Sequence, residues 1–269
     1  MTDLAQIPII TPIDNRIKLL PHHAAYYAKL GFRKFVYALW NGDENPIASR
    51  IEPLWRSVVP GGCQFFLRQS ISCNYDQYNG PAETPGLNAI REEFVPRGTW
   101  YCVADLDEFY RFPIGIGLAA AVEMLEADGY SAIHGEFYDR IACDGSFPPI
   151  PEFSSGRPSL DEAFPCVANL DLIAQCNHNK YGLVRNTTVW SGHHGTDLPN
   201  EEVMFHAMQA HHFKWSEGIQ DRLLRRHQAY ASQNLGWAGE SLKLLEFLNQ
   251  PDWVKHPDIH VRRADTLGV

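Results

Sequence analysis

The sequence predicts an α/β fold. We expect a single domain with a doubly wound, mostly parallel but mixed sheet flanked by helices, and a C-terminal helical extension. Short runs of β-branched and aromatic residues alternate with helical stretches over residues 1–125, which is typical of strands joined by crossover helices. The length of 269 residues suits one domain, and 45% hydrophobic residues supply a sizeable core.

The first strand is expected at 6–13, where Ile, Thr and Pro dominate, and Asp14 or Asn15 can cap the helical segment that follows. Pro21 suits the first turn of a helix, and Gly31 can end it in the left-handed conformation. One face of this helix is predicted to be buried, and it is formed by Leu20, Ala24, Tyr27 and Ala28.

Further apolar runs predict strands at 34–40, 63–70, 100–104 and 130–142. Helices are predicted through Ile51 to Val58, near 87–95 and at 115–128. From 143 to 200 the chain is rich in proline, glycine and serine, which predicts a long loop with one strand at 180–190. Residues 203–215 predict a strand or short helix, and 216–233 a helix capped by Ser216.

Composition narrows the class of protein. The formal net charge of −9 argues against nucleic-acid binding, which usually needs a basic surface. The six cysteines include no C-x-x-C pair, so we expect reduced, buried thiols and no disulfide framework. The N-terminus lacks a basic start followed by an apolar stretch, and no run approaches the length of about 18 apolar residues that a membrane span needs. A cytoplasmic protein without a transmembrane segment is therefore expected.

The stretch "WYCVADLDEFYRF" contains the strongest functional signal. The apolar run at 100–104 is followed at once by Asp105, Asp107 and Glu108. Ligands of parallel sheets bind at the carboxyl ends of the strands, and alternation would put Asp105 and Asp107 on one side. Their repulsion calls for a nearby cation, and oxygen ligands suit Mg²⁺ or Mn²⁺. A cap of the next turn is the alternative interpretation.

This stretch resembles the D-x-D-E-F signature of glycosyltransferases with the nucleotide-sugar-binding GT-A fold, in the family-2-like and family-92-like groups. "LLPHHAAYYAKLGFRKFVYALWNG" is similar to their first helix and second strand, and "AHHFKWSEGIQDRLLRRH" to their C-terminal segment. The three segments occur in the same order and span most of residues 15–230. The first strand departs from the pattern: it ends in "TPIDNR" where the group has a "KNE"-like motif, and Asp14 stands in for the acidic residue.

The resemblance implies transfer of a sugar from a UDP- or GDP-sugar to a glycan or other hydroxyl acceptor. It implies Asp107 as the direct ligand of Mn²⁺ or Mg²⁺, with Asp105 nearer the ribose or a metal-bound water. Independently of the family, a metal would stabilise the negative charge that develops on a nucleoside diphosphate leaving group. His212 matches a segment that returns to the metal and is the candidate third ligand.

Further candidates surround the donor. His193 and His194 are expected near the phosphates or the acceptor, and Lys180, Arg185 and Lys214 are candidate phosphate contacts. A hydrogen-bonded structural histidine and a solvated surface charge are the alternatives for each. Residues 1–125 would form the nucleotide-sugar-binding half, 126–235 the acceptor and metal half, and 236–269 a C-terminal tail.

An inverting transferase needs a carboxylate that deprotonates the acceptor hydroxyl. The candidates are Glu136, Asp139, Asp161 and Glu162, and Asp139 is favoured because it lies near the end of a predicted strand. A retaining enzyme would need no such base, and the sequence leaves both stereochemical courses open.

Two other functions fit the same residues. A metal-dependent hydrolase would use the Asp and His side chains to activate water. A non-catalytic carbohydrate-binding module could keep the fold without the reaction. Haloacid-dehalogenase-type phosphatases also contain D-x-D, but after the first strand, whereas here it follows the fourth.

Overall fold

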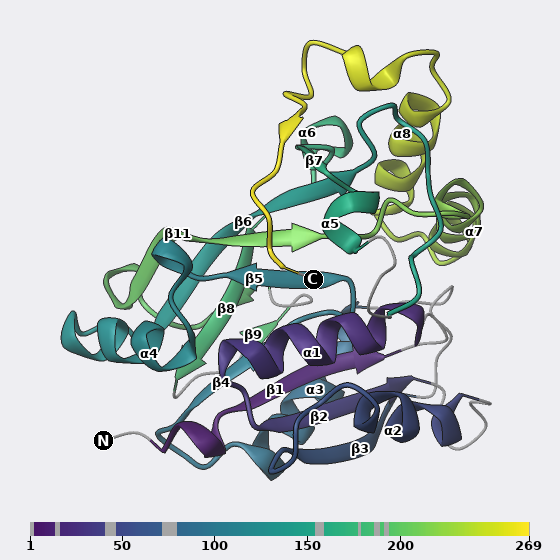
Figure 1. Ribbon diagram of the computed structural model, residues 1–269. Coiled ribbons are helices and arrows are strands. Elements are labelled where there is room, and N and C mark those ends of the chain that lie inside the picture. Colours follow the sequence, from purple (N-terminus) through teal and green to yellow (C-terminus); the bar gives the residue numbers. More distant parts are fainter. Residues whose placement is uncertain are drawn as a thin grey trace. The chain divides into compact units, whose positions relative to one another are not determined.

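The computed structural model of the protein describes residues 3–13, 17–40, 47–71, 80–153, 159–176, 179–185, 189–190 and 194–268 (Figure 1). The chain divides into two compact units. The first unit comprises Met1–Asn74, Asn79–Glu136 and Asn179–Ala210, and the second comprises Tyr75–Tyr78, Phe137–His178 and His211–Val269. The boundary falls inside two strands, β6 (Ala132–Ile141) and β11 (Val203–His212), which therefore contribute residues to both units.

The first unit is built on a mixed sheet. Its parallel part contains β1 (Pro8–Ile13), β2 (Lys34–Trp40), β3 (Gln64–Ile71) and β4 (Trp100–Val103). The spatial order is β3-β2-β1-β4, so the chain adds strands on both sides of β1, as a doubly wound sheet does. β8 (Asn179–Arg185) pairs antiparallel with both β4 and β6. β11 pairs with β5 (Glu108–Arg111), and β9 (Val189–Trp190) forms a separate small sheet with β10 (Gly195–Thr196).

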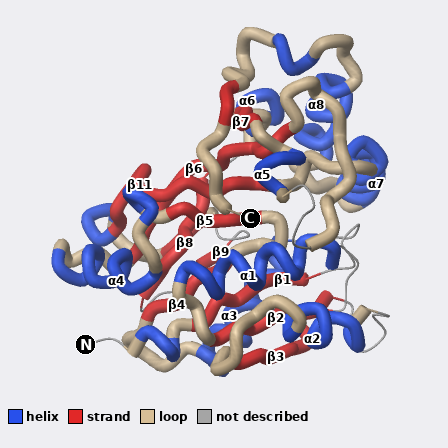
Figure 2. Tube along the Cα trace, in the orientation of Figure 1, coloured by secondary structure: helices blue, strands red, loops and turns tan. Residues whose placement is uncertain are grey.

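Helices cover both faces of the parallel strands, and the arrangement can be followed in Figure 2. On one face, Val36 lies in a common core with Ile90 of α3 (Gly80–Phe94). On the other, Phe35 packs against Trp55 of α2 (Ala48–Arg56), with ring centroids 5.6 Å apart. Successive side chains of a strand point to opposite faces, so β2 needs apolar residues throughout. The α/β class predicted from the sequence is confirmed.

The helix α1 (Leu20–Leu30) forms as its sequence predicts. Pro21 stands in the first turn, and Gly31 ends the helix with φ of 117°, a conformation that favours glycine. The predicted face of Leu20, Ala24, Tyr27 and Ala28 is buried. A later helix of the first unit, α4 (Leu118–Ala127), lies within the predicted range of 115–128.

The second unit is smaller and surrounds its own core. Its elements are β7 (Cys166–Ala168), β12 (Arg262–Arg263), α5 (Leu160–Ala163), α6 (Asp171–Ala174), α7 (Ile219–Ser232) and α8 (Ala238–Leu248). β7 pairs antiparallel with β12 and with the part of β6 from Asp139 to Ile141. Leu223 of α7 and Leu244 and Phe247 of α8 share one hydrophobic core with Trp215.

Several expectations about these segments were wrong. Cys143 and Cys166 form a disulfide, with Cα atoms 5.5 Å apart, where we expected free thiols. The Pro/Gly-rich stretch carries α5, β7 and α6 because its few apolar residues reach the core of the second unit. The helix α7 begins after Gly218, whose φ of 77° is left-handed, so Ser216 is not its cap.

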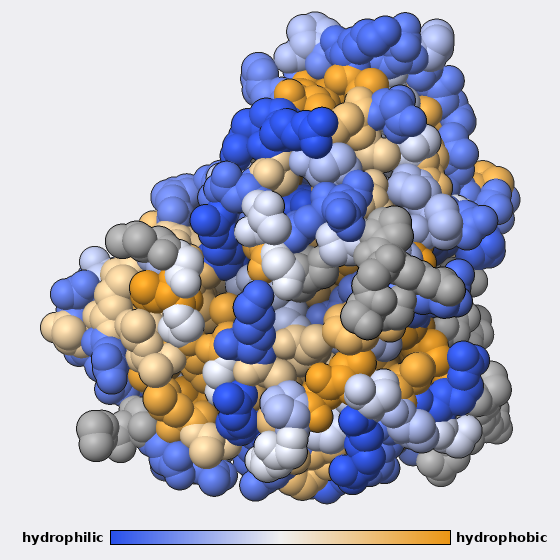
Figure 3. Space-filling model, viewed as in Figure 1, coloured by the Kyte–Doolittle hydropathy of each residue, from blue (hydrophilic) through white to orange (hydrophobic). Residues whose placement is uncertain are grey.

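The face of the molecule in Figure 3 mixes hydrophilic and hydrophobic residues. Large apolar side chains with substantial exposure among the described residues are Phe153, Leu172, Phe205 and Leu224. Scattered exposed apolar residues are normal for a folded protein. Within the described ranges, no helix combines the length and the apolar character that crossing a membrane requires.

Candidate active site

The predicted carboxylates lie where β4 ends. Residues 100–104 are buried, and β4 lies between β1 and β8, so the run is an internal strand. After Val103 the chain turns at Leu106 and Asp107, and the N–H of Glu108 donates to the carbonyl oxygen of Asp105 at 3.0 Å. The strand alternation that we expected to align Asp105 with Asp107 therefore stops before Asp107. The turn keeps both residues at the carboxyl end of β4 all the same.

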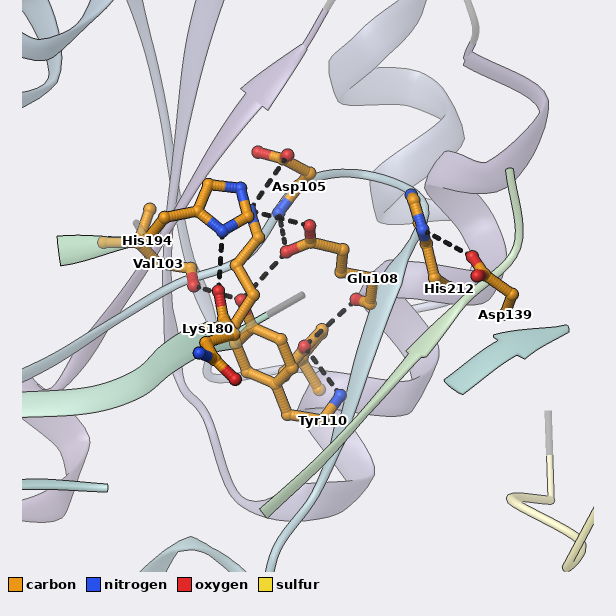
Figure 4. A network of polar contacts seen from close by, with 10 residues as sticks. Val103, Asp105, Glu108, Tyr110, Asp139, Lys180, His194 and His212 are labelled. Atoms are coloured by element: carbon orange, nitrogen blue, oxygen red, sulfur yellow. Dashed lines mark hydrogen bonds and ion pairs between the residues drawn. The ribbon is translucent and has the colours of Figure 1, made fainter. Parts of the chain in front are cut away.

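Glu108 points inward and holds a buried lysine. Its Oε1 lies 2.8 Å from Nζ of Lys180, and the two side chains are only 1% and 2% exposed. Lys180 Nζ also lies 3.5 Å from Oδ2 of Asp105, whose side chain is 38% exposed. Figure 4 shows Asp105, Glu108 and Lys180 directed toward one another. The cation that the clustered carboxylates require is thus partly supplied by Lys180, which is too buried to be a simple surface contact for phosphate.

The formal charges of this group still favour a divalent cation. Three carboxylates, from Asp105, Asp107 and Glu108, and one ammonium group, from Lys180, leave a net formal charge of −2. Among the described residues, no three His, Cys, Asp or Glu side chains stand together as a complete metal site. The donor set is nevertheless of the kind that Mg²⁺ and Mn²⁺ take, because these ions use one or two carboxylates and complete their shell with water and phosphate.

Hydrogen bonds from α1 support the turn. The hydroxyl of Tyr27 donates to the carbonyl oxygen of Glu108 and accepts from the N–H of Tyr110, both at 3.1 Å. The hydroxyl of Tyr26 donates to the carbonyl oxygen of Tyr110 at 2.8 Å. The hydroxyl of Tyr110 lies 2.9 Å from both Val103 O and Glu108 Oε2. These bonds fix β5 against α1, so the carboxylates stand on a rigid support.

His23, on the same helix, was missed by sequence reasoning. Its ring is fully buried, and neither ring nitrogen has a hydrogen-bond partner among the residues that the structure describes. Burial lowers the pKa of His23 to about 3, although the negative charges of Asp107 and then Asp105 act in the opposite direction. The ring is therefore neutral at physiological pH and lies within the electrostatic field of the candidate site. Only the fold could reveal this, since a histidine in an amphipathic helix carries no such signal.

The other predicted residues of the first unit are distributed over several places. His194 Nδ1 lies 2.6 Å from the carbonyl oxygen of Asn179, the neighbour of Lys180 (Figure 4). Arg185 pairs with Glu126 at 3.4 Å and lies over the Trp100 ring, at the opposite end of β4 from Asp105. The structure therefore does not bring Arg185 to the carboxylates. Asp14 and His193 lie outside the described residues.

Two of the candidate bases are held by structural partners. Asp161 Oδ1 lies 2.7 Å from the buried guanidinium of Arg140. Glu162 completes a capping box with Ser159 at the start of α5. Glu136, by contrast, is partly exposed, and its Oε1 lies 2.8 Å from Nδ1 of His206.

Asp139 anchors the candidate metal ligand of the second unit. It is 0% exposed and accepts from the N–H of Leu170 at 2.9 Å and from Nε1 of Trp215 at 2.6 Å. Its Oδ1 also lies 3.2 Å from Nδ1 of His212 (Figure 4). The His212 ring stacks on Phe137. A carboxylate this enclosed orients His212 and has no exposed surface to offer a substrate. In the neutral form of His212, donation from Nδ1 to Asp139 leaves the lone pair on Nε2.

A second carboxyl group near Asp139 also escaped sequence reasoning. Oδ2 of Asp171 is buried without a partner, and Oδ1 lies 3.4 Å from the Sγ of Cys176. Burial first, and then the charge of Asp139, raise the pKa of Asp171 to about 7, against the opposing charges of His212 and Lys214. In the sequence Asp171 looks like an ordinary first-turn residue of a short helix, so its burial is the only signal.

Replacing Asp171 with asparagine is expected to change how stability depends on pH. The folded-state pKa is about 7 and the reference value is 3.8. The unfolded chain therefore releases its proton first, and the wild type loses stability as the pH rises from about 4 to about 7. Asp171→Asn removes this loss, which is on the order of 2–4 kcal/mol. Urea unfolding at pH 4.5 and pH 8 gives the free energy of unfolding of both proteins. The stability of Asp171→Asn relative to the wild type should be higher at pH 8 than at pH 4.5. An equal stability difference at the two pH values contradicts the assignment.

The chain was compared with known proteins, and the similar solved structures have low sequence identity to it. No protein-family model matches the chain, and no curated protein sequence matches it. Among solved structures, residues 1–349 of TarS from S. aureus are 12% identical, with 93% of this chain and 71% of that chain covered and a TM-score of 0.39. The mannosyltransferase PcManGT from Pyrobaculum calidifontis, solved with GDP-Man and Mn²⁺, is 12% identical over 90% and 69%, with a TM-score of 0.40. A UDP-glucose pyrophosphorylase complexed with UDP-glucose is 9% identical over 77% and 74%, with a TM-score of 0.31. At these values no residue's role transfers from those proteins to this chain.

Proposed function

We propose that the protein is a glycosyltransferase that moves a sugar from a nucleotide-sugar donor to a hydroxyl group of a glycan or other acceptor. The observation that carries the proposal is the carboxylate cluster at the carboxyl end of β4, with a net formal charge of −2 after Lys180 is counted. A UDP- or GDP-sugar is the proposed donor, and Mn²⁺ or Mg²⁺ the proposed cation. Residues 1–125 would bind the donor, and 126–235 would supply the acceptor and metal-facing groups.

Each residue of the cluster has a separate part in this proposal. Asp107 would bind the cation directly, and the partly exposed Asp105 would bind a metal-bound water or the ribose. The buried ion pair of Glu108 and Lys180 would hold Asp105 in place through the Lys180 ammonium group. The bound cation would stabilise the charge of the departing nucleoside diphosphate. His194 and Lys214 stay candidate donor contacts, and so do Asp14 and His193.

His212 is the candidate metal ligand of the second unit. The hydrogen bond from Nδ1 to Asp139 leaves the lone pair on Nε2, which is the form in which histidine binds metals. We therefore keep His212 as a candidate metal ligand of the second unit and propose that Asp139 orients its ring. For an inverting reaction, Glu136 is the more accessible of the two proposed bases, because its side chain is 43% exposed and Asp139 is fully enclosed.

A thermal-shift panel of nucleotide sugars, each with and without Mn²⁺, tests the proposal. A ligand at about 100 times its dissociation constant stabilises a folded protein by about 2.7 kcal/mol. The expected result is a rise of several degrees with one donor, present only when Mn²⁺ is present. Stabilisation by Mn²⁺ without any nucleotide-sugar effect would favour the hydrolase. Binding of a nucleotide sugar with no transfer to any acceptor would favour the non-catalytic module.

A further inference from the structure

His23 lies beside the turn that carries Asp107. His23 and Tyr27 are one helical turn apart on α1, and their ring centroids are 4.6 Å apart. The hydroxyl of Tyr27 donates to the carbonyl oxygen of Glu108, the residue after Asp107. The His23 ring also lies 5.9 Å from the ring of Phe109, two residues after Asp107. Two ring contacts of the imidazole, and the hydrogen bond of Tyr27 to Glu108, thus place His23 close to the turn that carries Asp107.

The hydrogen bonding of His23 differs from that of its neighbours. The hydroxyl groups of Tyr26 and Tyr27 are bonded to the backbone of β5, whereas both nitrogens of His23 are buried without a partner. Such a group lowers the stability of the folded state, because it loses its hydrogen bonds to water on burial and forms no hydrogen bond within the protein. A leucine or phenylalanine would fill the same space without this cost. Buried polar groups that break a local rule are commonly found at functional sites.

The number of hydrogen-bonding atoms on the ring limits which role it can have. A neutral imidazole carries one N–H donor and adds no positive charge. It would therefore leave the net charge of the carboxylate cluster unchanged. The N–H of a neutral imidazole needs an acceptor, and the carboxylates at the end of β4 can only accept.

We propose that His23 is a positioning residue for the cation site: when a divalent cation binds, an imidazole N–H of His23 donates to the carboxylate of Asp107. The cation would be held by one oxygen of Asp107, and His23 would fix the other. Outer hydrogen bonds of this kind orient metal-binding carboxylates, and their loss typically weakens metal affinity 10- to 100-fold. The inference rests on the proposed function, because it needs Asp107 to bind the cation.

The test compares Mn²⁺ affinity and metal-free stability in His23→Phe and the wild type. Titration followed by electron paramagnetic resonance of free Mn²⁺ should show 10- to 100-fold weaker binding in the variant. The metal-free melting temperature should stay the same or rise, because an apolar ring replaces an unsatisfied polar one. His22→Phe, at the neighbouring buried histidine, is the matched control and should retain Mn²⁺ affinity. Mn²⁺ affinity equal to the wild type in a folded His23→Phe protein would overturn the inference.

Two further variants separate the loss of the N–H donor from a general loss of structure. His23→Gln keeps an N–H donor, and His23→Met has a similar length without one. Restored Mn²⁺ affinity in His23→Gln but not in His23→Met is expected, and equal affinities in the two would contradict the proposal. In the Mg²⁺-bound wild type, a slowly exchanging imidazole N–H resonance should appear that is absent without Mg²⁺ and absent in His23→Phe. A purely structural histidine would give the same resonance with and without Mg²⁺.

Asp107→Asn separates this inference from the proposed function. If the wild type fails to bind Mn²⁺ alone or with a nucleoside diphosphate, the proposed function fails and His23 has no site to support. If the wild type binds Mn²⁺, Asp107→Asn does not, and every His23 variant binds normally, only the role of His23 is wrong. When both are right, adding His23→Phe to Asp107→Asn should cause little further loss, since the two act through one contact.

Discussion

Replacing Asp107 with asparagine is expected to remove Mn²⁺-dependent binding of a nucleoside diphosphate while the protein stays folded. Asparagine keeps the size and one acceptor oxygen but lacks the charge that holds the cation. Loss of a transition-state charge contact of about 3–4 kcal/mol corresponds to a rate loss of several hundred-fold. The metal-free melting temperature should stay the same or rise, because one of three clustered negative charges is gone. Calorimetric titration of UDP and GDP, with and without Mn²⁺, measures the effect.

The control for Asp107→Asn is the same change at an exposed carboxylate of the first unit. Asp128, at the C-terminal end of α4, is exposed, and Asp128→Asn should leave Mn²⁺-dependent binding unchanged. If Asp107 merely caps its turn, the pattern reverses: the variant melts earlier while nucleotide affinity and metal dependence persist. If a folded Asp107→Asn protein binds nucleoside diphosphate with unchanged Mn²⁺ dependence, the proposed function is wrong.

Replacing Lys180 with methionine should destabilise the protein by about 3–5 kcal/mol, the usual consequence of leaving one partner of a buried ion pair alone. Glu108 is 1% exposed and lies 2.8 Å from the Lys180 ammonium, so the variant would bury an uncompensated carboxylate. Asp105 would also lose the ammonium 3.5 Å from its Oδ2. Urea or thermal unfolding of the purified variant gives the free-energy difference directly.

The double variant Lys180→Met with Glu108→Gln identifies the cause. Removing the second charge should restore most of the lost stability, because no unpaired ion is then buried. Arg185→Met, at the partly buried pair with Glu126 on the same strand, is the control and should cost less than Lys180→Met, because this pair keeps more contact with solvent. If Lys180 is instead a contact for phosphate alone, Lys180→Met would keep its stability and lose nucleoside diphosphate affinity, which contradicts the structural assignment.

Local sequence patterns predicted the elements around the site with good accuracy. The run of Trp100 to Val103 is an internal strand, Pro21 and Gly31 delimit α1, and the carboxylates follow β4. Each of these features depends on neighbours within a few residues: the apolar period, the fixed φ of proline and the positive φ of glycine. Such short-range preferences can be deduced from the chain without knowledge of what packs against it.

The partners of the charged residues required the fold. Lys180 is 75 positions from Asp105, and the two meet only because β8 pairs antiparallel with β4. The same register carries Arg185, five residues further on, to the start of β4 beside Trp100. Sequence reasoning treated the two cations alike, because their residue types are alike. The direction of a strand and its register decide which one reaches the carboxylates.

The burial of the candidate site residues also depended on the fold. The sequence by itself determined that an internal strand ends in Asp105, Asp107 and Glu108, because a run of apolar residues and a charged turn are local facts. Only the tertiary structure decided that Glu108 turns inward to Lys180, that Asp139 is enclosed by three donors, and that His23 is left without a partner. Solvent exposure and hydrogen-bond partners belong to surfaces built from distant segments, and one segment read alone does not contain them.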